Sequence, residues 1–185
     1  MLTYKETTKV LNAFNKSVVR AAKLRLKSKG HNVTSKLYKS IKGSINKRKR
    51  NSIMTLEFFM AKYGKFLDQG VKGTKSNYIE NKSSPFSFNK NKKSIGSKNI
   101  EGWGKKRNLR FRNKKTGRFE RGTVKSLTFL IARSIHEKGI KRTMFFTRGL
   151  KKRYALLPAK LATSLATDMV ADFTRGMQKR SKLKK

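Results

Sequence analysis

The residues that carry out catalysis are scarce in this chain and poorly spaced. His136-Glu137 begins like the His-Glu-x-x-His motif of zinc hydrolases, but position 140 is Ile and the only other histidine is His31. That motif needs two histidines one helical turn apart to hold zinc, so we interpret His136 as a surface histidine. The chain has no cysteine, and its nine carboxylates stand singly. We therefore expect no catalytic residues, no metal site and no cofactor.

A glycine-containing segment, Gly70-Val71-Lys72-Gly73-Thr74-Lys75-Ser76, superficially resembles a phosphate-binding loop. The spacing Gly-x-x-x-x-Gly-Lys-Ser/Thr is absent, and no hydrophobic strand leads directly into the segment. The same glycines match the Gly-x-x-Gly of a KH nucleic-acid-binding module. They also fit a flexible turn, which is the interpretation that we favour.

Aromatic side chains alternate with basic ones between residues 103 and 121. Aromatic rings stack on bases and cations neutralise phosphates, so this pattern indicates contact with nucleic acid or with an acidic partner. Phe111 and Phe119 fit this role and fit packing onto the core equally well, whereas Trp103, between two glycines, favours contact. The predicted contact residues are Trp103, Lys105, Lys106, Arg107, Arg110, Arg112, Lys114, Lys115 and Arg118.

The positive charge is not confined to that segment. The 185 residues include 49 Lys and Arg against 9 Asp and Glu, a formal net charge of +40. Residues 1–80, 81–125 and 126–185 carry excesses of +15, +13 and +12, so the whole surface is basic. Such a chain repels itself unless phosphates or acidic neighbours neutralise it. We therefore expect a polyanion or acidic proteins around it.

The first 70 residues predict a helix followed by a hairpin. Apolar residues at three- and four-residue steps indicate a helix over about 3–29, ending at Gly30. Thr34 or Ser35 would cap one further helical turn. Strands at 41–48 and 52–60 would pair through a turn at Arg50-Asn51. The second strand is largely apolar on both faces, which predicts that both faces are covered.

The middle of the chain differs in composition. Residues 61–70 predict a short helix or turn, and residues 71–122 are rich in Lys, Asn, Ser and Gly, which predicts an exposed loop. Within it, 109–112 and 118–121 would form a hairpin around Gly117. A loop of this length is usually functional or ordered by a partner.

The last third predicts two helices. The first spans 123–138 with a stripe of Leu127, Leu130, Ile131 and Ile135, and Gly139 marks its end. Met144-Phe145-Phe146 is a small hydrophobic anchor. The second helix covers about 148–178, with one apolar face formed by Leu150, Tyr154, Leu157, Leu161, Leu165, Met169 and Phe173. Pro158 either kinks it or starts a new helix.

Together these elements predict one α+β domain. Long N- and C-terminal helices would pack on a small antiparallel sheet, with a basic loop or hairpin insertion. We expect residues 1–70 and 123–178 to form the domain, 71–122 the insertion and 179–185 a basic tail. There is no run of about eighteen apolar residues and no signal-peptide core, so we expect no membrane segment.

Three short segments, in order, resemble the tail-completion and head–tail joining (neck) proteins of tailed bacteriophages. Residues 33–41, Val-Thr-Ser-Lys-Leu-Tyr-Lys-Ser-Ile, are similar to the family's T-G-x-L-x-x-S-I stretch, with Ser35 replacing glycine. Residues 63–70 resemble its Y-x-x-Y-x-E-x-G segment, with Asp68 replacing glutamate. Residues 130–140 and the following Phe145-Phe146 resemble its A-x-x-I-x-x-K-G-I … F-F ending. This sequence also departs from the family's pattern by carrying a longer basic insertion.

The resemblance implies a structural virion subunit that forms a closed ring between portal and tail, assembled in the host cytoplasm. The implied partners are copies of the same chain, in a ring of 6 or 12, together with portal or adaptor and tail proteins and packaged DNA. Residues implied in ring assembly or the core are Leu37, Ile41, Tyr63, Phe66, Asp68, Gly70, Phe145 and Phe146. Multiplying +40 by six or twelve gives +240 or +480, which requires counter-charge from DNA or acidic neighbours.

The same charge supports a rival hypothesis. A nonspecific nucleic-acid-binding protein of the ribosome-associated or nucleoid type would also be this basic, and its affinity would fall steeply with salt. Two observations separate the functions. A neck protein occurs in purified virions at a fixed ratio to portal, whereas the rival co-sediments with ribosomes or chromosome.

Overall fold

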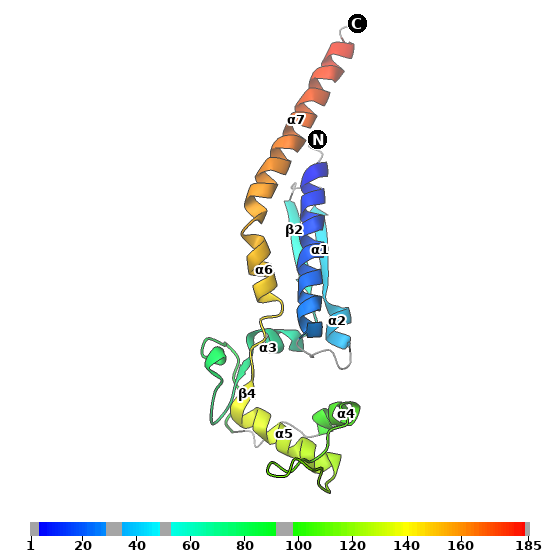
Figure 1. Ribbon diagram of the computed structural model, residues 1–185. Coiled ribbons are helices and arrows are strands. Elements are labelled where there is room, and N and C mark those ends of the chain that lie inside the picture. Colours follow the sequence, from blue (N-terminus) through cyan, green and yellow to red (C-terminus); the bar gives the residue numbers. More distant parts are fainter. Residues whose placement is uncertain (1–3, 29–34, 49–52, 92–97, 184–185) are drawn as a thin grey trace. The chain divides into compact units, whose positions relative to one another are not determined.

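Helices near both ends of the chain and a small antiparallel sheet give the predicted α+β fold (Figure 1). The computed structural model describes residues 4–28, 35–48, 53–91 and 98–183. Contacts divide these residues into two units. The first unit takes its residues from Met1–Ser28, Tyr38–Met60 and Phe145–Lys185, and the second from Lys29–Leu37 and Ala61–Met144. Each unit is described by itself.

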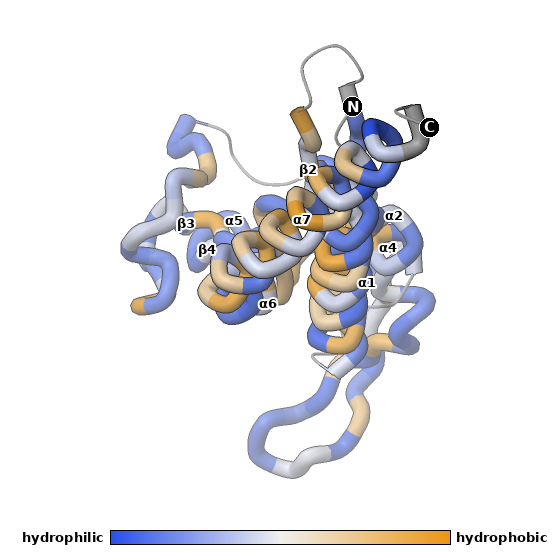
Figure 2. The backbone as a smooth tube through the Cα atoms, turned by 90° about the horizontal axis from the view of Figure 1, so that it is seen from above, coloured by the Kyte–Doolittle hydropathy of each residue, from blue (hydrophilic) through white to orange (hydrophobic). Residues whose placement is uncertain are grey.

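In the first unit, helix α1 spans Lys5–Ser28, within the predicted range. Its buried residues recur at three- and four-residue steps, and hydrophilic residues lie between them, as the alternating colours along α1 in Figure 2 show. Glu6 in the first turn and Arg25 and Lys27 in the last turn complement the helix dipole. The predicted cap Gly30 lies outside the described residues. The buried face is Thr7, Leu11, Phe14, Val18, Ala21, Ala22 and Leu26.

A short helix and a hairpin follow. Helix α2 covers Lys36–Ser40, directly after Ser35, and strands β1 (Lys42–Arg48) and β2 (Ile53–Phe59) pair antiparallel with Lys42 opposite Phe59. The predicted cap Thr34 and turn residues Arg50-Asn51 lie outside the described residues. Helix α1 crosses β1 at Gly43, where an added Cβ would lie 1.8 Å from Asn15 Oδ1. The missing side chain at Gly43 thus leaves room for the amide group of Asn15.

The expectation that both faces of β2 are covered is wrong for the isolated chain. Leu56 and Phe58 pack toward the core, whereas Ile53 and Phe59 on the other face are 50% and 52% exposed. The first unit covers one face of this two-stranded sheet and leaves the other face open. Whether a strand is buried on both faces therefore depends on how many elements pack on the sheet, and the sequence of the strand does not determine that.

Two helices complete the first unit. Helix α6 spans Thr147–Tyr154 and helix α7 spans Leu157–Leu183. A new helix therefore starts with Pro158 in its first turn, which was one of the two alternatives expected from the sequence. Helix α7 continues into the expected basic tail. The core cluster combines Phe14, Val18 and Leu157 with the partly buried Val10, Leu56, Phe58, Phe146, Leu150 and Leu161.

Asp168 of α7 caps the start of α1. Its carboxylate accepts hydrogen bonds from the backbone N–H of Glu6 (2.9 Å) and Thr7 (2.9 Å) and from the Thr7 hydroxyl (2.8 Å). The first N–H groups of a helix lack intrahelical partners, so this carboxylate supplies them. Burial opposes ionisation of Asp168, but these hydrogen bonds outweigh it and lower its pKa from the ordinary value.

The second unit is organised around a buried asparagine. Strands β3 (Val71–Lys72) and β4 (Gly139–Ile140) pair antiparallel, following helix α3 (Tyr63–Gln69) and the helix α5 (Val124–Lys138), respectively. Asn81, at the end of the 3₁₀-helix η1 (Ile79–Asn81), is fully buried and donates to the carbonyls of Val71 (2.9 Å) and Ile140 (2.7 Å). Its amide oxygen accepts from the N–H of Arg142 (3.0 Å). One side chain thus ties together three backbone segments.

Residues 71–122 are more structured than an exposed loop. Besides β3 and η1 they contain helix α4, Lys98–Lys106. Gly104 of α4 packs on α5, because an added Cβ would lie 2.6 Å from Thr128 Cγ2. The expectation of a loop was wrong here because two apolar residues, Ile100 and Trp103, are too few to establish a helical period.

Helix α5 also differs from its predicted burial. Thr123 caps it, accepting from Ser126 N–H (3.1 Å), and Gly139 follows it with a φ of +92°. The buried face is Thr128, Ala132 and His136 rather than the predicted leucine and isoleucine stripe, of which Leu130 is 50% exposed. The interpretation of His136 as a surface residue is therefore wrong. Within the described residues, no helix is both long and apolar enough to cross a membrane.

Candidate nucleic-acid interface

The predicted basic hairpin is present in the second unit. Arg112 and Phe119 pair antiparallel, Glu120 N–H donates to Phe111 O (3.1 Å), and Asn113 N–H donates to Arg118 O (2.9 Å). Gly117 has a φ of +68°, a conformation that favours glycine.

Asn113 fixes the turn of this hairpin. Its side-chain oxygen accepts from the N–H of Lys115 (2.8 Å) and Thr116 (3.1 Å). This Asx-type turn holds the backbone with the basic side chains of the tip turned outward. The hairpin is therefore a positioned element, and its cations stand on an ordered backbone.

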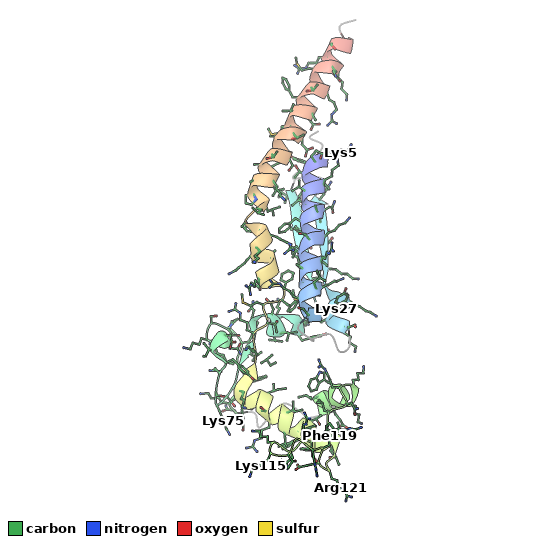
Figure 3. The ribbon with its side chains drawn as sticks, viewed as in Figure 1. Lys5, Lys27, Lys75, Lys115, Phe119 and Arg121 are labelled. Carbon is green, nitrogen blue, oxygen red and sulfur yellow. The ribbon has the colours of Figure 1, made fainter. Side chains whose placement is uncertain are left out.

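The two phenylalanines of the hairpin take different roles, which the sequence left open. Phe111 packs under the base of the hairpin, where an added Cβ at Gly122 would lie 2.2 Å from its ring. Phe119, which Figure 3 labels, is 67% exposed. The guanidinium groups of Arg110 and Arg112 lie 5.9 Å and 5.7 Å from the centre of its ring. An exposed ring between two cations can stack on a base while the cations approach phosphates.

The charge of the hairpin is strongly positive. Residues 109–121 contain six basic side chains and one acidic one, Glu120, which accepts from Asn113 Nδ2 (2.6 Å). Arg112 Nε donates to Gly117 O (2.6 Å), so that arginine also stabilises the turn. The exposed cations in this element are Arg110, Arg112, Lys114, Lys115, Arg118 and Arg121.

The other predicted contact residues belong to α4 and the residue that follows it. Lys105 pairs with Glu101 (3.0 Å), and Lys106 is exposed. The Arg107 guanidinium lies 5.8 Å from the Trp103 ring centre. The predicted set therefore divides into a hairpin group and an α4 group, and the sequence reasoning did not separate them.

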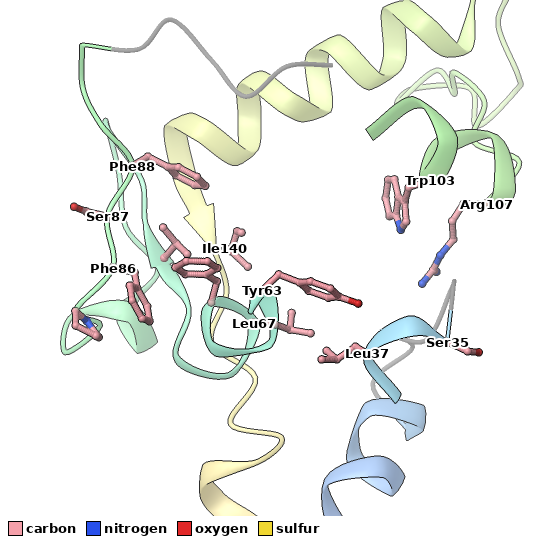
Figure 4. Close-up of a pocket in the computed structure, with 13 residues that line it drawn as sticks. Ser35, Leu37, Tyr63, Leu67, Phe86, Ser87, Phe88, Trp103, Arg107 and Ile140 are labelled. Carbon is pink, nitrogen blue, oxygen red and sulfur yellow. The ribbon is translucent and has the colours of Figure 1, made fainter. Parts of the chain in front are cut away.

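Trp103 and Arg107 line an apolar pocket of about 790 Å³. In Figure 4, Trp103 and Arg107 form one wall, and Tyr63, Leu67 and Ile140 lie across the cavity. We name it the aromatic pocket; all its lining residues belong to the second unit. They are Ser35, Leu37, Tyr63, Phe66, Leu67, Val71, Pro85, Phe86, Ser87, Phe88, Trp103, Arg107 and Ile140.

Sequence reasoning missed most of this pocket. Phe86 and Phe88 lie in a segment that was treated as loop, although Pro85-Phe86-Ser87-Phe88 alternates apolar and polar residues as an extended segment does. The backbone of Lys72 pairs with this segment, donating to Phe86 O (2.9 Å) and accepting from Phe88 N–H (3.0 Å). That alternation was the available signal.

The residues implied by the neck-protein resemblance fall into two classes. Leu37, Ile41 and Phe145 are buried apolar residues, and Asp68 and Gly70 are buried as well, while Phe146 packs against the core cluster of the first unit. Tyr63 and Phe66 are 47% and 41% exposed and line the aromatic pocket. The first class serves the core, and the second is open to a partner.

The glycine segment 70–76 serves a structural purpose. The N–H of Thr74 donates to His136 O (3.0 Å), and those of Lys75 and Ser76 donate to Glu137 O (3.0 and 3.1 Å). These donors cap the last carbonyls of α5, so they are not available to hold a phosphate. Hydrogen bonds to Lys75 and then Arg133 lower the pKa of Glu137 from its ordinary value, which keeps this junction charged.

Chemically, the described surface offers cations and aromatic rings. No cluster of three or more metal-binding side chains occurs in the part of the chain that the structure describes. No family model, curated protein or solved structure matches the sequence or the fold of this chain. The hairpin can neutralise phosphates and stack on a base, and the pocket can take an apolar group.

Proposed function

We propose that this chain is a non-enzymatic structural subunit of a tailed-phage virion. It forms the neck or tail-completion ring that joins the portal to the tail around the DNA channel. The order of the three family-like segments along the chain supports this function. The positioned basic hairpin supplies a contact for DNA in the channel or for acidic neighbouring rings.

One observation carries the proposal. Part of the exposed surface of α7 is apolar in a chain that is otherwise strongly basic, with Met169, Val170 and Phe173 59%, 65% and 71% exposed. An apolar helix face this open is costly in water and is typical of a protein that functions as an assembly. A subunit that acted alone on nucleic acid would gain nothing from it.

The test measures mass and location. Native mass spectrometry of the full chain should give one closed assembly of 6 or 12 copies that persists in high salt, and purified virions should contain the chain at a fixed ratio to portal. A chain that is monomeric at all concentrations and is missing from virions would overturn the proposal.

The second candidate is a nonspecific nucleic-acid-binding protein of the ribosome-associated or nucleoid type. The exposed Phe119 between Arg110 and Arg112 favours it. It predicts a monomer that co-sediments with ribosomes or chromosome, and whose log affinity for DNA or RNA falls linearly with log salt. Salt dependence alone does not separate the candidates, because any surface of this charge binds polyanions.

A further inference from the structure

Helix α7 has an apolar stripe that the first unit does not cover. Leu165, Met169, Phe173 and Met177 follow one another at four-residue steps, which places them on one side of the helix. Their exposed fractions run from 37% at Leu165 to 71% at Phe173. We call these four residues, with the neighbouring Val170, the α7 stripe.

The stripe is not a misplaced core face. Toward α1 the same helix buries Leu157, Ser164 and Asp168, and Asp168 is held there by the N–H groups of Glu6 and Thr7. The capping hydrogen bonds fix the rotation of α7 about its axis. Two polar residues are therefore inside and the larger apolar ones outside, an arrangement that favours a second partner for the stripe.

The segment around the stripe lacks the positive charge of the rest of the chain. Residues 161–174, which hold the stripe except Met177, contain no Lys or Arg and form the longest segment of the chain without a basic residue. Their two aspartates already have partners: Asp168 is buried against the start of α1, and Asp172 forms an ion pair with Arg175 (2.7 Å). A second copy of this chain can therefore approach α7 here without the repulsion that it would meet elsewhere.

The aromatic pocket has the complementary character. It is concave, with a volume of about 790 Å³, and among the described residues that line it only Arg107 is charged. Tyr63, Phe66 and Trp103 line it and are 47%, 41% and 37% exposed. The exposed Lys65 of α3 adds positive charge beside Phe66. A convex apolar helix face without basic side chains thus has a concave, largely apolar counterpart on the same chain.

We propose that the α7 stripe of one copy docks in the aromatic pocket of a second copy. Apolar anchors at helical spacing in a hydrophobic groove are a common mode of recognition between helices and domains. The contact joins two different surfaces, so it is heterologous and can close into a ring by rotation. The inference rests on the proposed ring function and names the surfaces that build it.

Cross-linking tests the contact directly. Because the chain has no cysteine, Ala166→Cys beside the stripe and Ser87→Cys at the pocket each introduce a single thiol. Equal amounts of the two single variants are mixed, allowed to exchange subunits and treated with a short bismaleimide. We expect a covalent dimer in the mixture and at least tenfold less of it from either variant alone.

The matched control moves the thiol away from the stripe. Ala171→Cys is also exposed on α7, and no residue three or four positions from it belongs to the stripe. Its mixture with Ser87→Cys should give at least tenfold less dimer. Ala166→Cys that links mainly to itself would show a symmetric helix pair and overturn the proposal. Equal yields from Ala166→Cys and Ala171→Cys would overturn it as well.

Charge substitutions test whether the contact builds the assembly. Phe173→Glu should weaken self-association at least tenfold by native mass spectrometry, because the ring is replaced by a charge. Ala171→Glu, at an exposed position of α7 away from the stripe, is the control of equal charge. Tyr63→Glu in the pocket should act like Phe173→Glu, while Tyr78→Glu, which does not line the pocket, should leave association unchanged. Circular dichroism checks that each variant is folded.

The outcomes separate this inference from the function on which it rests. Closed rings of fixed copy number that give no link and tolerate Phe173→Glu would overturn the docking and leave the ring function standing. A link within dimers or open filaments, without closed rings, would support the docking and contradict the neck role. A monomer without any link would contradict both.

Discussion

The two units of this protein have different interiors. In the first unit, apolar side chains from α1, β2, α6 and α7 meet around Phe14, Val18 and Leu157. In the second unit, many of the buried positions are polar, including Asn81, Ser84, Thr128 and His136. Apolar burial is nondirectional, whereas each hydrogen bond needs a particular partner at a particular distance.

This difference indicates which substitutions should destabilise each unit. The first unit should tolerate conservative apolar exchange and respond to lost volume. The second should respond to the loss of single hydrogen-bonding groups, because Asn81 alone serves Val71, Ile140 and Arg142. The predictions below test this contrast and the contrast between the basic hairpin and the basic surface elsewhere, from the largest expected effect to the smallest.

Removing volume from the first unit should have the largest effect. Phe14→Ala should lower the free energy of unfolding by about 3–5 kcal/mol, the usual cost of a large cavity in a core. Leu24→Ala on the same helix is the control, because Leu24 is 57% exposed. Hydrogen exchange should speed up in α1 first. Exchange that speeds up equally in β3 and β4 would show one cooperative interior instead of two.

Removing the asparagine from the second unit should cost less. Asn81→Ala should lower the free energy of unfolding by about 3 kcal/mol, taking roughly 1 kcal/mol for each of three hydrogen bonds. Hydrogen exchange of Val71 and Ile140 reports the change, with the exposed Asn91→Ala as control. If Asn81→Leu proves as stable as the natural chain, the hydrogen bonds are not what holds this unit.

The hairpin should bind DNA more specifically than basic residues elsewhere. Lys114→Ala with Lys115→Ala should reduce the slope of log affinity against log salt by about 2, since each phosphate contact contributes roughly 0.9. Lys151→Ala with Lys152→Ala on α6 is the matched control, as both lysines are exposed. Equal changes in the two double variants would mean that the whole basic surface binds, without a preferred element.

Acid should weaken the first unit through Asp168, with a small effect. Its pKa is lowered in the folded chain, so its stabilising contribution is complete above the unfolded value of about 3.9 and is lost as pH falls through the folded value. Thermal unfolding followed from pH 6 to pH 2 should show a smaller acid-induced decrease in Asp168→Asn than in the natural chain. Asp172→Asn on the same helix should retain the full decrease.

The sequence predicted the elements well where the signal was local. The spacing of Leu11, Phe14 and Val18 predicted α1. Pro158 predicted either a kink or a new helix, and a new helix, α7, starts there. Asn113-Lys114-Lys115-Thr116-Gly117 predicted the turn of the basic hairpin, since the turn needs only neighbouring atoms and a glycine with positive φ.

Burial was predicted less well, because it depends on what covers an element. Ile53 and Phe59 were expected inside and are exposed, whereas His136 was expected outside and is buried with its Nε2 3.2 Å from Asn89 O. Neither outcome follows from the residue type. Helix α4 was missed because nine residues rich in Lys, Gly and Asn carry almost no apolar period.

The candidate site shows the same limit. Sequence alone determined the charge of +40 and the alternation of aromatic and basic residues, because these are properties of composition and order. Only the tertiary structure separated the exposed Phe119 from the packed Phe111 and gathered Tyr63, Phe86 and Trp103 around one pocket. Contacts between distant residues form when the chain closes long loops and buries apolar area, and no local pattern encodes which pairs will meet.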